Sequence, residues 1–147
     1  MAKKPSEMVA VVATIDPDAN TAQAYTSDWV NMKDWEQVLA IVMAGDLGSS
    51  ATLDAKLQQA TDGSGTSAKD ITGKAITQLT QAGTDSDKQA LIQARADELD
   101  VAGGFTHVAL VMTVGTATSD SGAVLLGLNP TYGPASDYDL ASVDEIV

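Results

Sequence analysis

Runs in which apolar side chains occupy every second position follow one another along most of the chain. Residues 9–15 alternate in this way and end at the turn-forming residues "DPDAN", and residues 51–61 set Leu53, Ala55 and Leu57 against polar neighbours. A period of two places successive side chains on opposite faces of a β-strand. The pattern therefore predicts a strand over 9–15, and over 51–61 a half-buried strand with one solvated face.

Other segments depart from simple alternation. Residues 36–45, "EQVLAIVMAG", are apolar on both parities, which is typical of a strand covered on both faces. Residues 22–32 suit a partly exposed strand that enters a turn at "KDW", and residues 71–81 suit a Thr-rich strand. The Gly- and Ser-rich residues 61–70, between the strands expected over 51–61 and 71–81, predict a long hairpin loop.

Residues 87–100, "DKQALIQARADELD", carry two conflicting signals. Their Ala, Leu, Gln, Lys and Glu favour a helix by propensity. Ala90, Ile92 and Ala94 alternate with polar residues and fit a strand equally well. We favour a strand followed by one helical turn at "ADELD", because the segments on both sides have strand patterns.

The stretch "THVALVMTVGTATSDSGAVLLGL", residues 106–128, holds two apolar runs on either side of a polar tip. The pattern predicts a hairpin whose turn is "TSDSG", with a return strand at 123–128 that is apolar on both parities. The first strand has one core-facing parity, made up of Val108, Leu110, Met112 and Val114. His107, the only histidine, falls on the opposite and more polar parity.

About eight short strands separated by Gly, Ser, Thr and Asp turns predict an all-β fold. We expect an antiparallel β-sandwich or jelly roll with at most short helical turns. The length of 147 residues suits one domain with one core. We expect residues 1–8 and 129–147 to form extended arms, because Pro130, Gly133 and Pro134 oppose regular structure in the second.

Charge and composition narrow the function classes. The formal net charge is −12, with only eight Lys and Arg residues, so a phosphate backbone would be repelled and nucleic acid is not an expected partner. No run reaches the roughly 18 apolar residues of a membrane helix, and we expect no membrane partner. The chain has no cysteine, so it can form no disulfide and no thiolate metal site.

Candidate catalytic and metal motifs fail on their spacing. Asp16 to Asn20 match the start of a calcium loop, but Thr21 stands where the loop needs Gly and Ser27 where it needs Glu. One histidine cannot build a histidine-rich zinc site, and no G-x-S-x-G elbow accompanies it. We therefore expect no catalytic, cofactor-binding or metal-binding residues, no cofactor and no enzymatic activity.

Several segments resemble small structural proteins of tailed bacteriophages. They are "VLAIVMAGDLGSSATLDAKLQQATD", "GKAITQLTQAGTDSDKQALIQARADELD", "GFTHVALVMTVGTA" and "YGPASDYDLASVDEIV". The resemblance implies a virion protein, made in the host cytoplasm, that serves as a cement or decoration protein. Such a protein binds the major capsid protein on the outer surface of an icosahedral head. A head–tail or tail component, or a glycan-binding host-attachment module on the same fold, are the alternatives.

A protein of this kind contacts its neighbours through arms and exposed aromatic side chains. We expect it to form a homo-oligomer, a dimer or a trimer, with both terminal arms lying across neighbouring subunits. Trp29 and Trp35 fit positions in the core equally well. The interface candidates are Lys3, Lys4, Trp29, Trp35, His107 and Tyr132.

Overall fold

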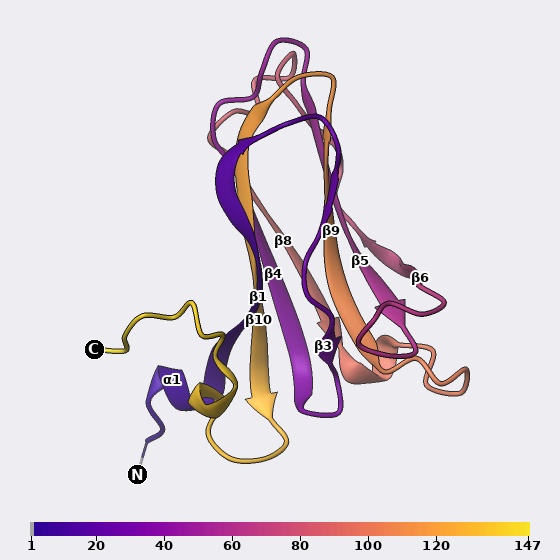
Figure 1. The fold of residues 1–147 in the computed structure, drawn as a ribbon, viewed down its shortest axis with the longest axis vertical. Helices are drawn as coiled ribbons and strands as arrows, with labels where there is room; N and C mark the ends of the chain where they lie inside the picture. Colours follow the sequence, from indigo (N-terminus) through magenta and orange to yellow (C-terminus); the bar gives the residue numbers. More distant parts are fainter. Residues whose placement is uncertain (1) are drawn as a thin grey trace.

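Two antiparallel β-sheets pack face to face in the computed structural model, which describes residues 2–147 (Figure 1). Sheet A contains, in spatial order, β1 (Val9–Asn20), β10 (Ser119–Pro130), β4 (Trp35–Ala44) and β8 (Gln89–Arg95). Sheet B contains β2 (Ala24–Thr26), β9 (His107–Gly115), β5 (Thr52–Ala60) and β6 (Lys69–Ala75). In sheet B, β3 (Val30–Asn31) also pairs with β9, and β7 (Leu79–Thr80) also pairs with β5. The helical elements are the single turns α1 (Pro5–Met8), η1 (Ala96–Glu98) and η2 (Ala135–Tyr138).

The strand order is that of a jelly roll. The chain starts in sheet A with β1, passes to sheet B with β2, and returns to sheet A with β4. It then forms β5 and β6 in sheet B, β8 in sheet A, β9 in sheet B and β10 in sheet A. All the pairings are antiparallel. This alternation between two sheets confirms the predicted all-β jelly-roll class.

The core lies between the sheets. Its largest fully buried side chains are Leu53, Leu57, Leu110, Met112 and Leu125. Along β5 burial alternates from Thr52 to Gln59, as the sequence pattern predicts for a strand with one solvated face. The strand-plus-turn prediction for residues 87–100 is also confirmed, because β8 leads directly into η1.

The predicted hairpin over residues 106–128 is wrong. β9 pairs with β5, β2 and β3 in sheet B, whereas β10 pairs with β1 and β4 in sheet A. The turn between them carries the chain from one sheet to the other, with Thr116 at a φ of 71°. Alternation and turn residues are the same for a hairpin and for such a crossing, so the sequence pattern did not separate them.

Two other predicted boundaries change. β1 continues past residue 15 to Asn20, with a register shift between Ile15 and Asp18. Pro17 is tolerated in this strand because β1 lies at the edge of sheet A, where a missing N–H breaks no pairing. The single strands predicted over 22–32 and 71–81 are each split into two shorter ones.

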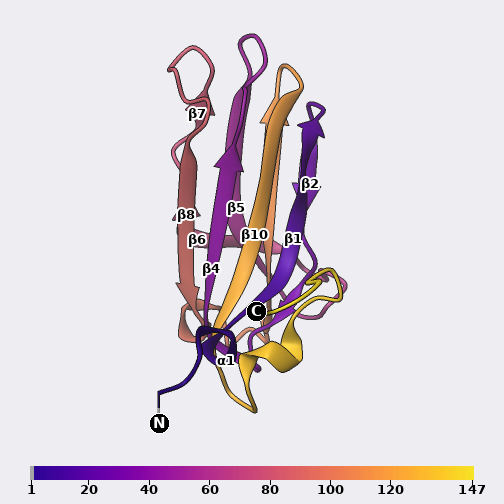
Figure 2. The same cartoon turned by 90° about the vertical axis from the view of Figure 1, so that its left-hand side faces the viewer.

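The two terminal segments meet at one end of sheet A (Figure 2). Residues 5–8 form α1 instead of an extended arm, and α1 contacts η2. The backbone N–H of Val11 donates to the Asp139 carboxylate at 2.8 Å, and the N–H of Leu140 donates to the Val11 carbonyl at 3.0 Å. The C-terminal segment is therefore partly folded onto β1. We call α1 and η2 the foot of the molecule.

Candidate functional site

Three of the interface candidates are exposed, two of them next to each other before α1 and the third after β10. Lys3 and Lys4 precede α1 and are exposed, and Tyr132 is 67% exposed after the end of β10.

No helix in the described part of the chain is long and apolar enough to span a membrane.

The two tryptophans pack against the chain itself. Trp35 is 3% exposed, and its ring meets that of Tyr138 edge-on with the centroids 5.3 Å apart. Trp29 is half-buried beside Gly65, in the loop between β5 and β6. Of the two positions that the sequence allows for Trp35, an interface or the core, the structure shows the core.

His107 has the surroundings of a structural residue. It is half-buried at the start of β9, and its Nδ1 lies 2.8 Å from the hydroxyl of Thr106. Ala109 and Val111, which share its parity, are buried, so this side of β9 is less solvated than predicted. Within residues 2–147 no group of three His, Asp or Glu side chains is placed to hold a metal ion.

The outer face of sheet B is polar, and its side chains pair with one another. Asp70 lies 2.9 Å from the Lys56 ammonium and accepts a hydrogen bond from Gln58 at 2.8 Å. Gln78 donates to Asp54 at 2.8 Å. Hydrogen bonds from Gln58 and Lys56 hold the pKa of Asp70 below its ordinary value. A face whose polar groups are paired in this way suits contact with water.

The outer face of sheet A carries an apolar patch, bordered on β8 by the exposed polar side chains of Gln89, Gln93 and Arg95. The alternate residues of β4 face the core, so the prediction that β4 is covered on both faces is wrong for the single chain. Met43 is 53% exposed, and Leu91 on neighbouring β8 is 63% exposed. Cross-strand pairing joins these strands to β10 in one continuous patch. This patch, the apolar face, consists of Leu39, Ile41, Met43, Leu91, Val124 and Leu126.

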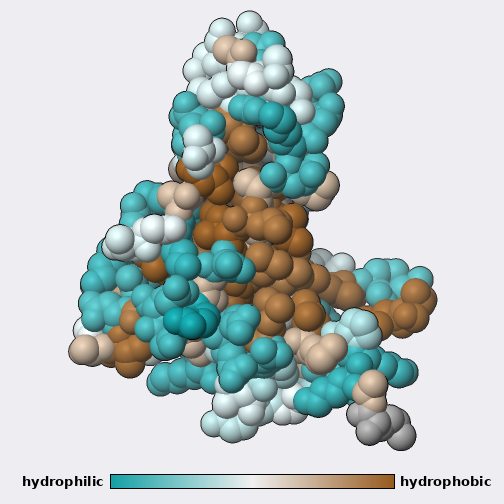
Figure 3. Space-filling model, turned by 180° about the vertical axis from the view of Figure 1, so that it is seen from behind, coloured by the Kyte–Doolittle hydropathy of each residue, from teal (hydrophilic) through white to brown (hydrophobic). Residues whose placement is uncertain are grey.

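Sheet A and the hydrophobic surface beside it can each be followed in one view. Figure 2 looks onto sheet A, with β8, β4, β10 and β1 side by side. Figure 3, seen from behind where β8 is near the viewer, shows hydrophobic residues in a band along the body. The teal hydrophilic surface lies on either side of this band.

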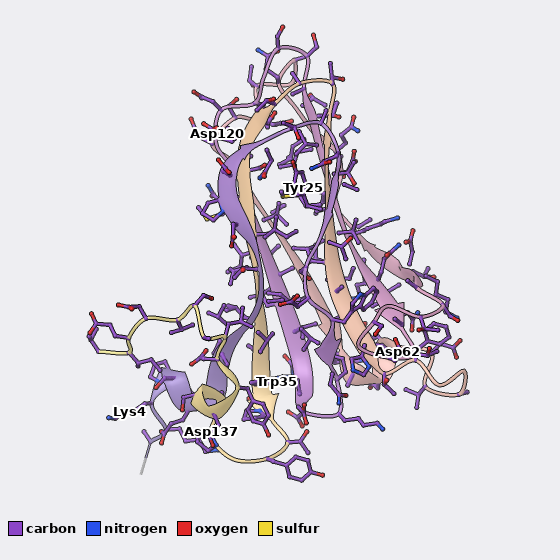
Figure 4. All side chains as sticks on the ribbon, viewed as in Figure 1. Lys4, Tyr25, Trp35, Asp62, Asp120 and Asp137 are labelled. Atoms are coloured by element: carbon purple, nitrogen blue, oxygen red, sulfur yellow. The ribbon has the colours of Figure 1, made fainter. Side chains whose placement is uncertain are left out.

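A groove runs along sheet A from the end that lies farthest from the foot to Ser142 of the C-terminal segment. Its volume is about 800 Å³, and Ile41, Met43 and Val124 of the apolar face contribute to its lining. Three exposed carboxylates, from Asp16, Asp18 and Asp120, also line it. Figure 4 shows Asp120 at this end and Lys4 at the opposite end. We call this feature the acidic groove.

This arrangement suits binding to a protein better than chemistry. A contiguous apolar patch on an otherwise acidic exterior is typical of a protein–protein contact. The sequence carried a signal for it, because residues 36–45 are apolar on both parities. We predicted a covering layer there, and the chain itself does not supply one.

No protein-family model matches the chain, and neither does any curated protein sequence. Among solved structures, a chain of the cowpea mosaic virus empty virus-like particle is 11% identical, with a TM-score of 0.49. The match covers 91% of this chain and 88% of that one. A chain of broad bean stain virus is also 11% identical, with a TM-score of 0.48 over 91% of this chain and 96% of that one. A CBM61 structure with bound β-1,4-galactotriose is 7% identical, with a TM-score of 0.34 over 74% and 66% of the two chains.

Proposed function

We propose that this chain is a virion structural protein of the cement or decoration type. It binds the major capsid protein on the outer surface of an icosahedral phage head and stabilises that head. The observation that carries the proposal is the apolar face, which equips a small acidic protein for assembly with other chains, copies of itself included. The resemblance of the sequence to tailed-phage structural proteins supports the same function.

The fold suits this role. A cement protein needs a rigid framework, and the strands of the described chain all lie in two packed sheets with a single core. It also needs a solvated side, which the paired polar groups on sheet B provide. The net charge of −12 is compatible with a place outside the shell, away from the packaged DNA.

The aromatic positions do not favour a glycan-binding module. Such a module would place Trp and Tyr on an open sheet face, where sugar rings can stack. Trp35 is buried, Trp29 packs on a loop of its own chain, and Tyr132 follows the last strand. In the described part of the chain, neither tryptophan lies on the outer face of a sheet.

The proposal is tested with heads that lack the protein, prepared from the phage that carries its gene. Purified protein is added to these heads, the mixture is sedimented, and the temperature at which the heads release DNA is measured. We expect binding that saturates at a fixed number of copies per capsomer, together with a higher release temperature. Heads incubated with heat-unfolded protein are the control.

Two results would contradict the cement function. The protein could remain in the supernatant while intact heads sediment without it, and co-purify with tails instead. It could also bind cell-surface glycans in preference to heads, which would support the host-attachment alternative.

A further inference from the structure

The apolar face by itself is too small for a stable interface. Seven residues of β4 pair with β8, so three strands spaced about 4.8 Å apart give a face of roughly 14 by 23 Å, or about 330 Å². A standard interface buries about 800 Å² per partner. The partner on this face must therefore also contact neighbouring features. The acidic groove lies at one end of the face, and the foot lies at the other.

The positive charges of the chain point to the missing contact. Of its eight Lys and Arg residues, five form ion pairs within the chain. Across residues 2–147 the three cations without a carboxylate partner within 4.0 Å are Lys3, Lys4 and Lys33. Two of these three lie next to each other in the exposed segment before the foot.

The carboxylates of the acidic groove also lack a cation. Asp16, Asp18 and Asp120 take part in none of the ion pairs of the described chain. The groove thus combines an apolar lining with unpaired negative charge. A lysine side chain matches both features, because its methylene stem can lie on Met43 and Val124 while its ammonium reaches a carboxylate.

Lys3 and Lys4 cannot reach the groove of their own chain. From Val9 to Asp16, the nearer of the two groove carboxylates on β1, the strand rises through seven residues, or about 23 Å. Residues 2–4 span at most about 10 Å when fully extended. Any lysine from this segment in an acidic groove must therefore come from another copy.

We propose that two copies pack their apolar faces together with antiparallel strands, so that residues 2–4 of each copy lie in the acidic groove of the other. The two-fold axis lies in the plane of the interface and runs across the strands. In this orientation the basic end of each copy meets the acidic end of its partner, so the dimer contains two such contacts. The parallel orientation would bring the two acidic ends together. Two-fold dimers are also the commonest closed assemblies.

This inference rests on the proposed function, because it assigns a second copy of the chain as the first partner of the apolar face. The dimer forms in the absence of heads. The test is the molar mass of the purified protein, measured by light scattering across a concentration series. We expect twice the chain mass of 15.1 kDa. Leu91→Lys introduces a charge into the face and should give a monomer. The matched control Thr72→Lys adds the same charge on the exposed outer side of β6 and should leave the dimer unchanged.

The position of the arms is tested by exchanging the charges. Lys3→Glu with Lys4→Glu should raise the dissociation constant of the dimer by about tenfold or more, from the loss of four ion pairs. Combining it with Asp16→Lys and Asp120→Lys should restore the dimer, whereas Lys33→Glu alone should have little effect. Circular dichroism establishes that each variant is folded.

Each outcome separates the two proposals. A wild-type protein that is monomeric at every concentration, or a Leu91→Lys variant that is folded and still dimeric, overturns the dimer. Failure of the exchanged charges to restore association overturns the arm placement. A monomer that still binds heads overturns this inference and leaves the cement function standing. A dimer that ignores heads contradicts the cement function and supports this inference.

Discussion

Gly127→Ala tests how the C-terminal segment closes the end of the sandwich. A Cβ at Gly127 would lie 2.5 Å from two ring atoms of Trp35. The ring cannot move freely, because it is 3% exposed and meets the ring of Tyr138. Overpacking of this kind costs about 1–3 kcal/mol, and alanine recovers about 0.5–1 kcal/mol relative to glycine in a strand.

We therefore expect a net loss of about 1–2 kcal/mol in the free energy of unfolding, or roughly 2–8 °C in Tm for a domain of this size. Thermal and urea unfolding followed by circular dichroism measure the loss. The near-ultraviolet signal of the tryptophans should change as well. Gly63→Ala is the matched control, because its new Cβ would have no neighbour closer than 3.7 Å. Equal stability of the two variants would refute the packing of Trp35 on Gly127.

Three further changes probe other parts of the structure. Leu57→Ala in the core should lower the free energy of unfolding in urea by about 2–5 kcal/mol, whereas Leu91→Ala should change it by at most about 0.5 kcal/mol for the dilute monomer. Equal losses would contradict the assignment of inner and outer faces. Asp139→Ala leaves the backbone N–H of Val11 without its acceptor, so it should cost about 1–3 kcal/mol and speed proteolysis of the C-terminal segment. Unchanged proteolysis would count against the hydrogen bond that holds this segment on β1. The hydrogen bond from Lys69 lowers the pKa of Asp100, so its stabilising effect is present above the ordinary value of 3.8 and is lost as the pH falls through the lowered pKa. In an NMR titration Lys69→Met should return that pKa toward 3.8, and an unshifted midpoint would refute the pairing.

Local patterns predicted the strands well where one face of a strand is wet. β5 and β8 show this, because alternation along a strand reports directly which side chains the core removes from water. Turn residues predicted breaks in the chain, but they do not determine which sheet the next strand joins. β9 and β10 were assigned to one hairpin for that reason, although each pairs with strands distant in sequence.

The candidate site was harder to predict than the fold. The apolar pattern of β4 predicts a covering layer on both its faces, but the pattern does not say whether that layer belongs to the same chain, and here the outer face stays partly exposed. The acidic groove joins Asp16 and Asp120, which are far apart in sequence and meet only because β1 pairs with β10. Trp35 carried no signal that distinguishes a buried anchor from an exposed one.

The proposed function makes this chain a stoichiometric component of a phage head. Virions of the phage that we propose as the source of this chain can be separated into heads and tails, and the chain can be quantified in each fraction by mass spectrometry against the major capsid protein. We predict a fixed ratio to the capsid protein in the head fraction and none of the chain in tails. Its absence from heads, or its enrichment in tails, would contradict the proposed function.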